Sequence, residues 1–537
     1  MKKYFALIFL QFLFIGAEII IEGDSKNEYK IEGNIITISK LVNRMKISGK
    51  DFDKTIVVAT SGEIEFNNLR LTSTNNLTPL IINENCRVLL YLEGKSFLED
   101  SISNENKGVI LLKESAKLEI LQVYRYIGCL YIIPNNLMAI YGDNSSSFYM
   151  YSGAIKIFST SNKIGGLYIA KEIVFEDGIF IYKGMSGPNH AIKAENITIS
   201  KGEYNLNLES GAGIKAENII RIGEKDEDNS DVKIYIKTSG KGIDAKNVEI
   251  NSGTINIKSK DNGINIYDDN VKEQKCMGDC NSFIKIYDGE IYIDSEENGI
   301  QSKGDVFITG GKSIIFGGAH TGNYPIKQES LLKVKFGSLL VGGTNIKNLI
   351  NINSTQTEYW YKNKIKIDSI INIIDNEIIN CITYHYYDSI DYYDSIDYYK
   401  CDYHIKGREI IHVRIPKNLD YLYFHNPLSN FTIKIINNGT ENEIKTNEIR
   451  TLISYELNEE QGDNKIEETN ISKQNNNKDY KDSTIPSSSY LDNKFKDENN
   501  SNDKVSQSSV IQRESSEYLC SVKKSNILFF LLGIALF

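Results

Sequence analysis

A short unit that repeats along residues 191–304 limits what this chain can fold into. Gly242 and Gly263, the first residues of two consecutive units, are 21 residues apart. Two other steps are longer because they contain insertions at 224–231 and 271–282. A repeat of this period predicts a solenoid, in which each unit buries its apolar face against its neighbours. The units begin AIKAEN at 191–196, GIKAEN at 213–218, GIDAKN at 242–247, GINI at 263–266 and GIQSKG at 299–304.

Apolar and polar residues alternate within each unit, as in VEI at 248–250 and INI at 255–257. Alternation in short β-branched runs that are broken by Asn, Gly or Ser is typical of strands. A leucine-rich repeat has a similar length but requires leucine at fixed positions and a helical segment, and the units have neither. The sequence therefore predicts an all-β parallel β-helix, a solenoid whose coils of about 21 residues contain three short strands each.

Strand patterns continue on both sides of the repeats and suggest domain boundaries. Residues 18–165 have looser spacing and are expected to form an N-terminal cap and irregular coils, followed by the regular β-helix at 166–345. Residues 346–455 lose the repeat but keep strand patterns, which predicts a C-terminal β-rich extension. Residues 456–520 are dominated by Asn, Ser, Asp, Glu and Lys and are expected to form a disordered linker.

Apolar runs at both ends of the chain predict export and display. Residues 1–17 combine two lysines with a short apolar run, which is typical of a cleaved signal peptide; the alternative is an uncleaved anchor. Residues 521–537 end in an apolar run behind a polar spacer, as in a GPI-attachment signal. Ser515 is the expected attachment site, although Glu517 stands where a small residue is preferred, and a tail anchor is the alternative. We therefore expect an extracellular protein displayed at the cell surface.

Charge and hydropathy exclude several partners. The formal net charge of −10 argues against nucleic acid, which requires a basic surface. No apolar run in the body of the chain is long enough to span a bilayer, so membrane contact is expected only through the lipid anchor. We expect a monomer. N-glycosylation sequons, each weak alone, are consistent with secretion, among them those at Asn76, Asn144, Asn196, Asn353, Asn430 and Asn438.

Cysteine spacing predicts two local disulfides in the exported protein. Cys276 and Cys280 frame a short insertion, and Cys381 and Cys401 frame a Tyr- and Asp-rich tandem. Cys520, the seventh cysteine, would leave with the C-terminal signal. A zinc site is disfavoured, because no paired CxxC or nearby histidine completes a tetrahedral set.

The order of these pieces resembles the secreted β-helix proteins known as carbohydrate-binding domain-containing proteins of plant-fibre-degrading bacteria and anaerobic gut fungi. The resemblance covers about residues 25–345. It implies a right-handed, pectate-lyase-like β-helix that binds calcium and acidic plant cell-wall polysaccharide (polygalacturonate, or pectin), and cellulose less clearly, without established catalysis. It is carried by 29–39, 55–72, 92–98, 191–318, GNYPI at 322–326 and FGSLLVGG at 336–343.

The same resemblance predicts where calcium would bind. The family places an Asp-Asp-Gly-Ile step at the start of each coil, where carboxylates on successive coils share the ion. This chain keeps an acid beside an amide only before Gly263 and Gly299. Calcium prefers six to eight oxygen ligands. The alternative is that these Asp and Asn residues only build turns and amide ladders. The expected ligands are Asp261, Asn262, Asp268, Asp269, Glu297 and Asn298.

Outward positions of the core strands predict a sugar-binding face. Lysine can pair with sugar carboxylates as a point charge, and tyrosine rings can stack on sugars. Such residues also decorate β-helices for solubility alone. The expected face contains Lys233, Tyr235, Lys237, Lys258 and Tyr292.

Three function classes follow. A non-catalytic, calcium-assisted polysaccharide-binding protein is the leading hypothesis. A polysaccharide lyase or hydrolase is the second, but a lyase needs a base near calcium, and Arg221 is the only arginine in the repeats. A surface adhesin or wall-structural protein without a sugar ligand is the third.

Overall fold

The computed structural model describes residues 19–445 with internal gaps. Within the described residues, all secondary-structure elements are β-strands. Predictions for the signal peptide (1–17), the linker (456–520), the C-terminal signal (521–537) and Ser515 lie outside the described residues. No described helix could cross a membrane. Also outside lie 1–18, 24–27, 74–77, 101–106, 124–127, 136–137, 160–164, 185–189, 226–231, 268–281, 319–322, 336, 345–352, 355–356, 367, 376–380, 386–396, 402–407, 427–430, 438–439 and 446–537.

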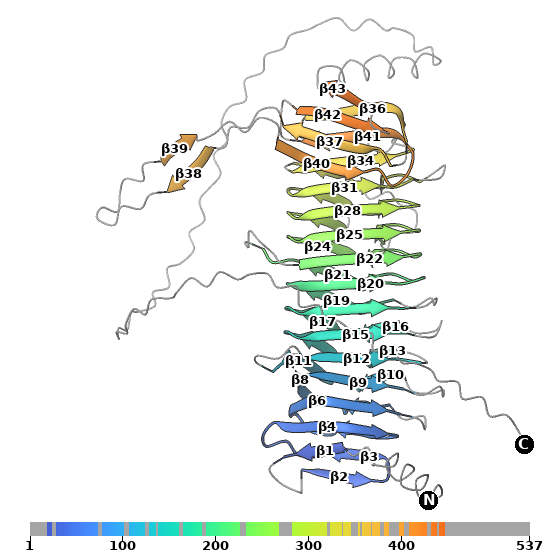
Figure 1. Ribbon diagram of the computed structural model, residues 1–537, viewed down its shortest axis with the longest axis vertical. Coiled ribbons are helices and arrows are strands. Elements are labelled where there is room, and N and C mark those ends of the chain that lie inside the picture. The colour runs from blue at the N-terminus through green and yellow to red at the C-terminus, as the bar shows by residue number, and fades with distance from the viewer. Residues whose placement is uncertain are drawn as a thin grey trace, which may run out of the picture. The chain divides into compact units, whose positions relative to one another are not determined.

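The strands form three parallel stacks, here named A, B and C, and a coil contributes to each stack either a separate strand or part of a longer one (Figure 1). The predicted parallel β-helix is therefore confirmed. Stack A contains β3 (Ile35–Ile38), β5 (Thr55–Val58), β7 (Leu80–Ile82), β10 (Gly108–Leu112), β13 (Met138–Gly142), β16 (Gly165–Ile169), the first parts of β19 (Ile192–Ile199) and β21 (Ile214–Ile222), β23 (Ile243–Ala245), β26 (Ile264–Ile266), β29 (Ile300–Ser302) and β32 (Ile326–Gln328).

Stacks B and C complete each coil. Stack B contains β4 (Met45–Phe52), β6 (Gly62–Thr72), β8 (Arg87–Glu93), β11 (Lys117–Gln122), β14 (Ser147–Met150), β17 (Glu172–Phe175), the second parts of β19 and β21, β24 (Asn247–Ile250), β27 (Phe283–Ile286), β30 (Asp305–Ile308), β33 (Leu332–Val334) and β35 (Asn353–Ser354). Stack C contains the ends of β4 and β6, then β9 (Lys95–Glu99), β12 (Cys129–Ile133), β15 (Ala154–Phe158), β18 (Ile179–Lys183), β20 (Gly202–Asn207), β22 (Val232–Thr238), β25 (Thr254–Ser259), β28 (Glu290–Ser295), β31 (Lys312–Phe316) and β34 (Ser338–Gly343).

Register between coils aligns the units that the sequence repeats. Ile243 pairs with Ile264, which gives the predicted step of 21 residues. The coils average about 26 residues, because most turns between strands are longer than in that one coil. Parallel pairing also continues across residue 165, where Met138 pairs with Gly165, so the irregular and regular coils form one continuous solenoid.

The core consists of columns of apolar side chains that point inward from the three stacks. In stack A, Ile214, Ile243, Ile264, Ile300 and Ile326 follow one another in register and are fully buried. The coils lie about 4.8 Å apart, so each isoleucine packs on its equivalents above and below. The alternation that predicted strands is thus the alternation between core and surface.

Glycine directly precedes the stack A strand in several coils, because the next coil leaves no room for a side chain. A Cβ on Gly263 would lie 2.5 Å from the carbonyl oxygen of Gly299 and would overlap Ile293. A Cβ on Gly242 would likewise lie 2.5 Å from the carbonyl oxygen of Gly263. The repeated Gly-Ile pair is therefore a steric requirement of coil-to-coil packing.

Antiparallel strands close the described solenoid at both ends. At the N-terminus, β1 (Ile19–Glu22) pairs with β4, and β2 (Tyr29–Glu32) pairs with β3. At the C-terminus, β41 (Leu419–Asn426) pairs with β34 and with β36 (Thr357–Ile365). Because an antiparallel strand cannot continue a parallel coil, these pairings end the stacking.

The predicted C-terminal β-rich region contains a further sheet that packs on the last coils. Its strand order is β40 (Arg408–Arg414), β37 (Ile370–Asp375), β42 (Phe431–Asn437) and β43 (Thr440–Lys445). Ile371, Ile373 and Ile433 of this sheet share a buried cluster with Ile314 and Phe316 of β31. Two more strands, β38 (Cys381–His385) and β39 (Asp397–Cys401), form a separate hairpin.

Substitution of Gly263 by alanine tests the steric requirement. Overpacking of this kind costs about 1–3 kcal/mol, so we expect Gly263→Ala to lower the free energy of unfolding by that amount. Urea unfolding followed by circular dichroism measures it. Gly33→Asn is the control, because Gly33 has a φ of 58° and its Cβ would meet no atom within 4 Å. Equal losses in the two variants would contradict the steric account.

Candidate functional site

The outer face of stack A carries a column of polar residues at the third position of each repeated unit. In register, the column runs Lys193, Lys215, Asp244, Asn265 and Gln301. Side chains in such a column are about 4.8 Å apart at their backbones. Charged and amide groups from successive coils are therefore held in direct contact.

This column forms one side of a hollow with a volume of about 440 Å³, here named the lysine hollow. Glu217 reaches its edge from β21, where one extra residue forms a β-bulge relative to β19. Tyr267 donates a hydrogen bond from its hydroxyl to the carbonyl oxygen of Ala216, at 2.8 Å. The hollow is lined by Lys193, Lys215, Glu217, Lys241, Asp244, Asn265 and Tyr267.

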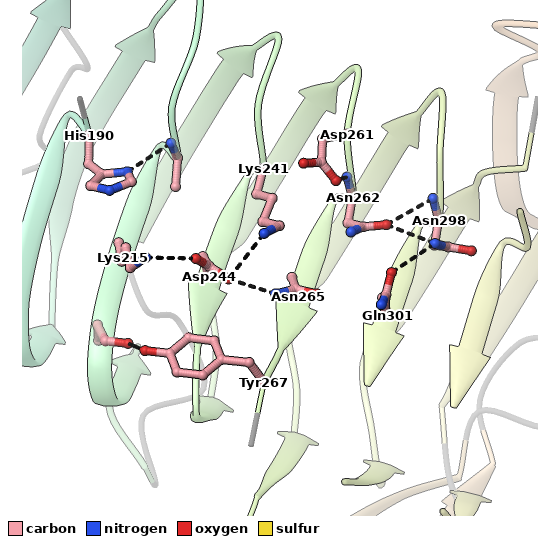
Figure 2. A network of polar contacts seen from close by, with 12 residues as sticks. His190, Lys215, Lys241, Asp244, Asp261, Asn262, Asn265, Tyr267, Asn298 and Gln301 are labelled. Atoms are coloured by element: carbon pink, nitrogen blue, oxygen red, sulfur yellow. Dashed lines mark hydrogen bonds and ion pairs between the residues drawn. The ribbon is translucent and has the colours of Figure 1, made fainter. Parts of the chain in front are cut away.

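Asp244 organises the polar contacts inside the lysine hollow. Figure 2 shows Lys215, Lys241 and Asn265 converging on its carboxylate. Lys215 Nζ lies 3.3 Å from Asp244 Oδ2, and the Asn265 amide donates to Oδ1 at 2.7 Å. Lys241 Nζ is more distant, at 4.0 Å. Asp244 is only 5 % exposed, so its negative charge lies beneath the surface of the hollow and attracts the ammonium groups of Lys215 and Lys241.

The hollow has one more positive than negative side chain. Its second acid, Glu217, is exposed and lies 3.3 Å from Lys193 Nζ. The local charge of the lining, three lysines against two carboxylates, is opposite in sign to the net charge of the whole chain. The hollow is thus a cationic site on an acidic protein.

His190 borders the same region and responds to its charge. Its Nδ1 accepts a hydrogen bond from the backbone N–H of Ala212 at 3.0 Å. Burial and then the positive charges of Lys215 and Lys193 lower the pKa of His190 to about 4. The imidazole is therefore neutral near pH 7, as the Nδ1 acceptor role requires.

An amide ladder occupies the turns where calcium ligands were predicted. Asn262 Oδ1 accepts two hydrogen bonds from Asn298, from its backbone N–H at 3.1 Å and from its side-chain amide at 2.9 Å. Asn298 donates onward to Gln301 Oε1 at 3.0 Å (Figure 2). Its own Oδ1 accepts a hydrogen bond from the backbone N–H of Tyr324 at 2.8 Å. These amide oxygens accept hydrogen bonds from N–H groups of the next coil, which is the amide ladder of the alternative interpretation.

The acidic members of the predicted calcium set are not gathered into a site by the described residues. Asp261 Oδ1 accepts the backbone N–H of Asn262 at 2.6 Å, and the Glu297 side chain is exposed. Asp268 and Asp269 lie outside the described residues. In the described part of the chain, no group of three His, Cys, Asp or Glu side chains is placed to hold a metal ion. Two of the six predicted ligands, Asp268 and Asp269, are among the residues that the structure does not describe, so calcium binding stays a prediction.

The predicted sugar-binding face lies on stack C and is only partly open. Lys233, Tyr235 and Lys237 are exposed on β22, and Lys258 is the register neighbour of Lys237. Tyr292 is packed edge-on against Phe316 at a ring-centroid distance of 6.0 Å, beside the C-terminal sheet. Burial raises the pKa of Tyr292 to about 12. Its ring is therefore used in packing.

The structure describes one of the two predicted disulfide pairs and the candidate lyase base. Cys381 and Cys401 are directly opposite each other in the β38–β39 pairing, a backbone register that suits a disulfide. Cys276 and Cys280 lie outside the described residues. Arg221, the candidate lyase base, lies on stack B and forms an ion pair with Glu249 at 3.1 Å.

Comparison with known proteins gives no identity for the chain. No protein-family model, no curated protein and no solved structure matches it. The resemblance noted in the sequence is confirmed for the β-solenoid fold, and the function rests on the site itself.

The lysine hollow was missed in the sequence although its signal was present. Lys193, Lys215 and Asp244 occupy the third position of three consecutive units, directly after the core isoleucine. A comparison of that position between units shows two cations followed by an anion. The bulge at Glu217 and the reach of Tyr267 across two coils had no such signal.

Stability should fall in mild acid because His190 is held neutral. Its pKa is about 4 in the folded protein and about 6.5 when unfolded, so the unfolded chain binds more protons between these values. The free energy of unfolding should therefore drop by roughly 2–3 kcal/mol through His190 alone as pH falls from 7 to 4.5. Urea unfolding of the protein and of His190→Gln at both pH values measures this. A pH dependence identical in the two proteins would exclude the assignment.

Proposed function

We propose that this protein binds acidic polysaccharide, of the polygalacturonate class, without catalysis and at the cell surface. The observation that carries the proposal is the lysine hollow, a concave cationic site on an acidic solenoid. Polygalacturonate carries one carboxylate on each sugar. Lys193 and Lys215, on successive coils about 4.8 Å apart at the backbone, offer two neighbouring point charges for these carboxylates.

The side chains of the lysine hollow suit a sugar acid better than a free inorganic anion. Lys193 and Lys215 supply the charge, while Asn265 and Tyr267 add an amide and an aromatic ring to the lining. Lysine heads pair with carboxylates, and an aromatic ring can pack on the apolar face of a sugar. Asp244 holds Lys215 and Lys241 in the lining, but its negative charge also competes with a ligand carboxylate for both lysines.

Lysine substitution in the hollow should weaken binding to polygalacturonate. Each lysine contact in a partly exposed site contributes up to about 1 kcal/mol, so we expect Lys193→Gln with Lys215→Gln to raise the apparent Kd by roughly 5- to 30-fold. Affinity electrophoresis of the full-length protein in gels that contain polygalacturonate measures this. Thermal unfolding of each variant reports whether the fold is kept.

Two further variants control for non-specific charge effects. Lys40→Gln with Lys95→Gln removes two exposed lysines from distant coils and should leave the Kd unchanged. Asp244→Asn keeps an acceptor for Asn265 but frees Lys215 and Lys241, so it should tighten binding. A loss of retention in the distant-lysine control equal to that in the hollow variant would reject the hollow as the site.

Chelation distinguishes direct lysine binding from calcium bridging. Lysine pairs with a carboxylate without a metal ion, so binding in the lysine hollow predicts that polygalacturonate is retained equally with calcium and with excess EDTA. The calcium-assisted form of the proposal keeps the predicted ligands Asp261, Asn262, Asp268, Asp269, Glu297 and Asn298. Loss of retention in EDTA, restored by calcium and abolished in Asp268→Asn with Asp269→Asn, would show that calcium-assisted form to be correct.

A further inference from the structure

Four lysines lie at the turn that leads from stack C to stack A in two adjacent coils. Lys237 and Lys258 are register neighbours near the ends of β22 and β25. Lys241 and Lys260 follow them in the turns that lead to β23 and β26. We name Lys237, Lys258 and Lys260 the corner band, and Lys241 connects this band to the lysine hollow, which it also lines.

Only one lysine of the corner band, Lys258, forms an ion pair within the described part of the chain. Lys237 and Lys260 are exposed and form no ion pair within the described part of the chain. The Lys258 side chain is 67 % exposed and approaches Asp294 only to 3.8 Å. The one acid in these two turns, Asp261, directs its carboxylate to the backbone N–H of Asn262. Three ammonium groups therefore remain available to a ligand.

Acidic turns limit the band on both sides. The equivalent turn of the preceding coil carries Glu209, and that of the following coil carries Glu296 and Glu297, all exposed. A polyanion that ran along the solenoid axis at this corner would meet these carboxylates after two coils. One that ran around the corner would stay beside lysines from the corner band through Lys241 into the hollow.

We infer that one acidic polysaccharide chain occupies the hollow and the corner band together. The chain runs around this corner, from stack C to stack A, and not along the solenoid axis. The inference rests on the proposed function and specifies its ligand as the interior of a linear polyuronate rather than a chain end. Lys258 lies near the end of β25 and Lys260 lies in the turn that follows it, so these two lysines extend the track beyond the hollow. A short oligomer fills the hollow alone, whereas a longer one reaches both.

Binding of galacturonate oligomers of two lengths to the full-length protein tests this inference. Isothermal titration should show the decamer binding roughly tenfold more tightly than the dimer, because the longer chain gains the band contacts. In Lys237→Gln with Lys258→Gln and Lys260→Gln, the decamer should fall to the affinity of the dimer, while dimer binding stays unchanged. Lys40→Gln with Lys95→Gln is the control and should keep the preference for the decamer.

The outcomes separate the two proposals. Equal affinities for dimer and decamer in the unmodified protein, or an unchanged decamer preference in the corner-band variant, would overturn the extended track and leave binding at the hollow intact. Absence of binding for both oligomers would overturn the proposed function as well. A decamer preference that is lost only in the corner-band variant supports the inference.

Discussion

Backbone pairing between successive coils is the constraint on which the rest of this molecule depends. Each stack A strand lies so close to the next that a Cβ on Gly263 would stand 2.5 Å from the oxygen of Gly299. Because the register is fixed by this packing, equivalent residues of the repeats form columns, apolar inside and polar outside. The isoleucine core and the outer polar column of stack A therefore follow from the same strand register.

The same register brings like charges together and explains how the hollow is built. Lys193 and Lys215 are direct register neighbours, which is unfavourable unless acids lie between or beside them. Glu217 and Asp244 supply those acids: Glu217 lies 3.3 Å from Lys193, and Asp244 lies 3.3 Å from Lys215. The acids do not neutralise the site, because Lys241 adds a third cation. The hollow is therefore stable without a ligand and still attracts an anion.

Much of the fold could be predicted from the sequence, because alternation and the Gly-Ile unit follow directly from strand geometry and coil contact. The mean coil length could not, since turns accept insertions without changing the register. Asn262 and Asn298 were ambiguous between metal ligands and an amide ladder, and the ladder contacts appear only when the coils are stacked. Tyr292 could not be assigned either, because a sheet from far along the chain packs beside it.

The central claim is that sugar carboxylates bind among the lysines of the hollow. Carbodiimide coupling of digalacturonate to the full-length protein, followed by peptide mass spectrometry, tests it directly, because a bound sugar holds its activated carboxylate beside particular amines and so raises the amide yield there above the yield at other exposed lysines. The account predicts sugar adducts concentrated on Lys193, Lys215 and Lys241. Adducts spread evenly over exposed lysines, with Lys40 and Lys95 modified as often as the hollow, would contradict it.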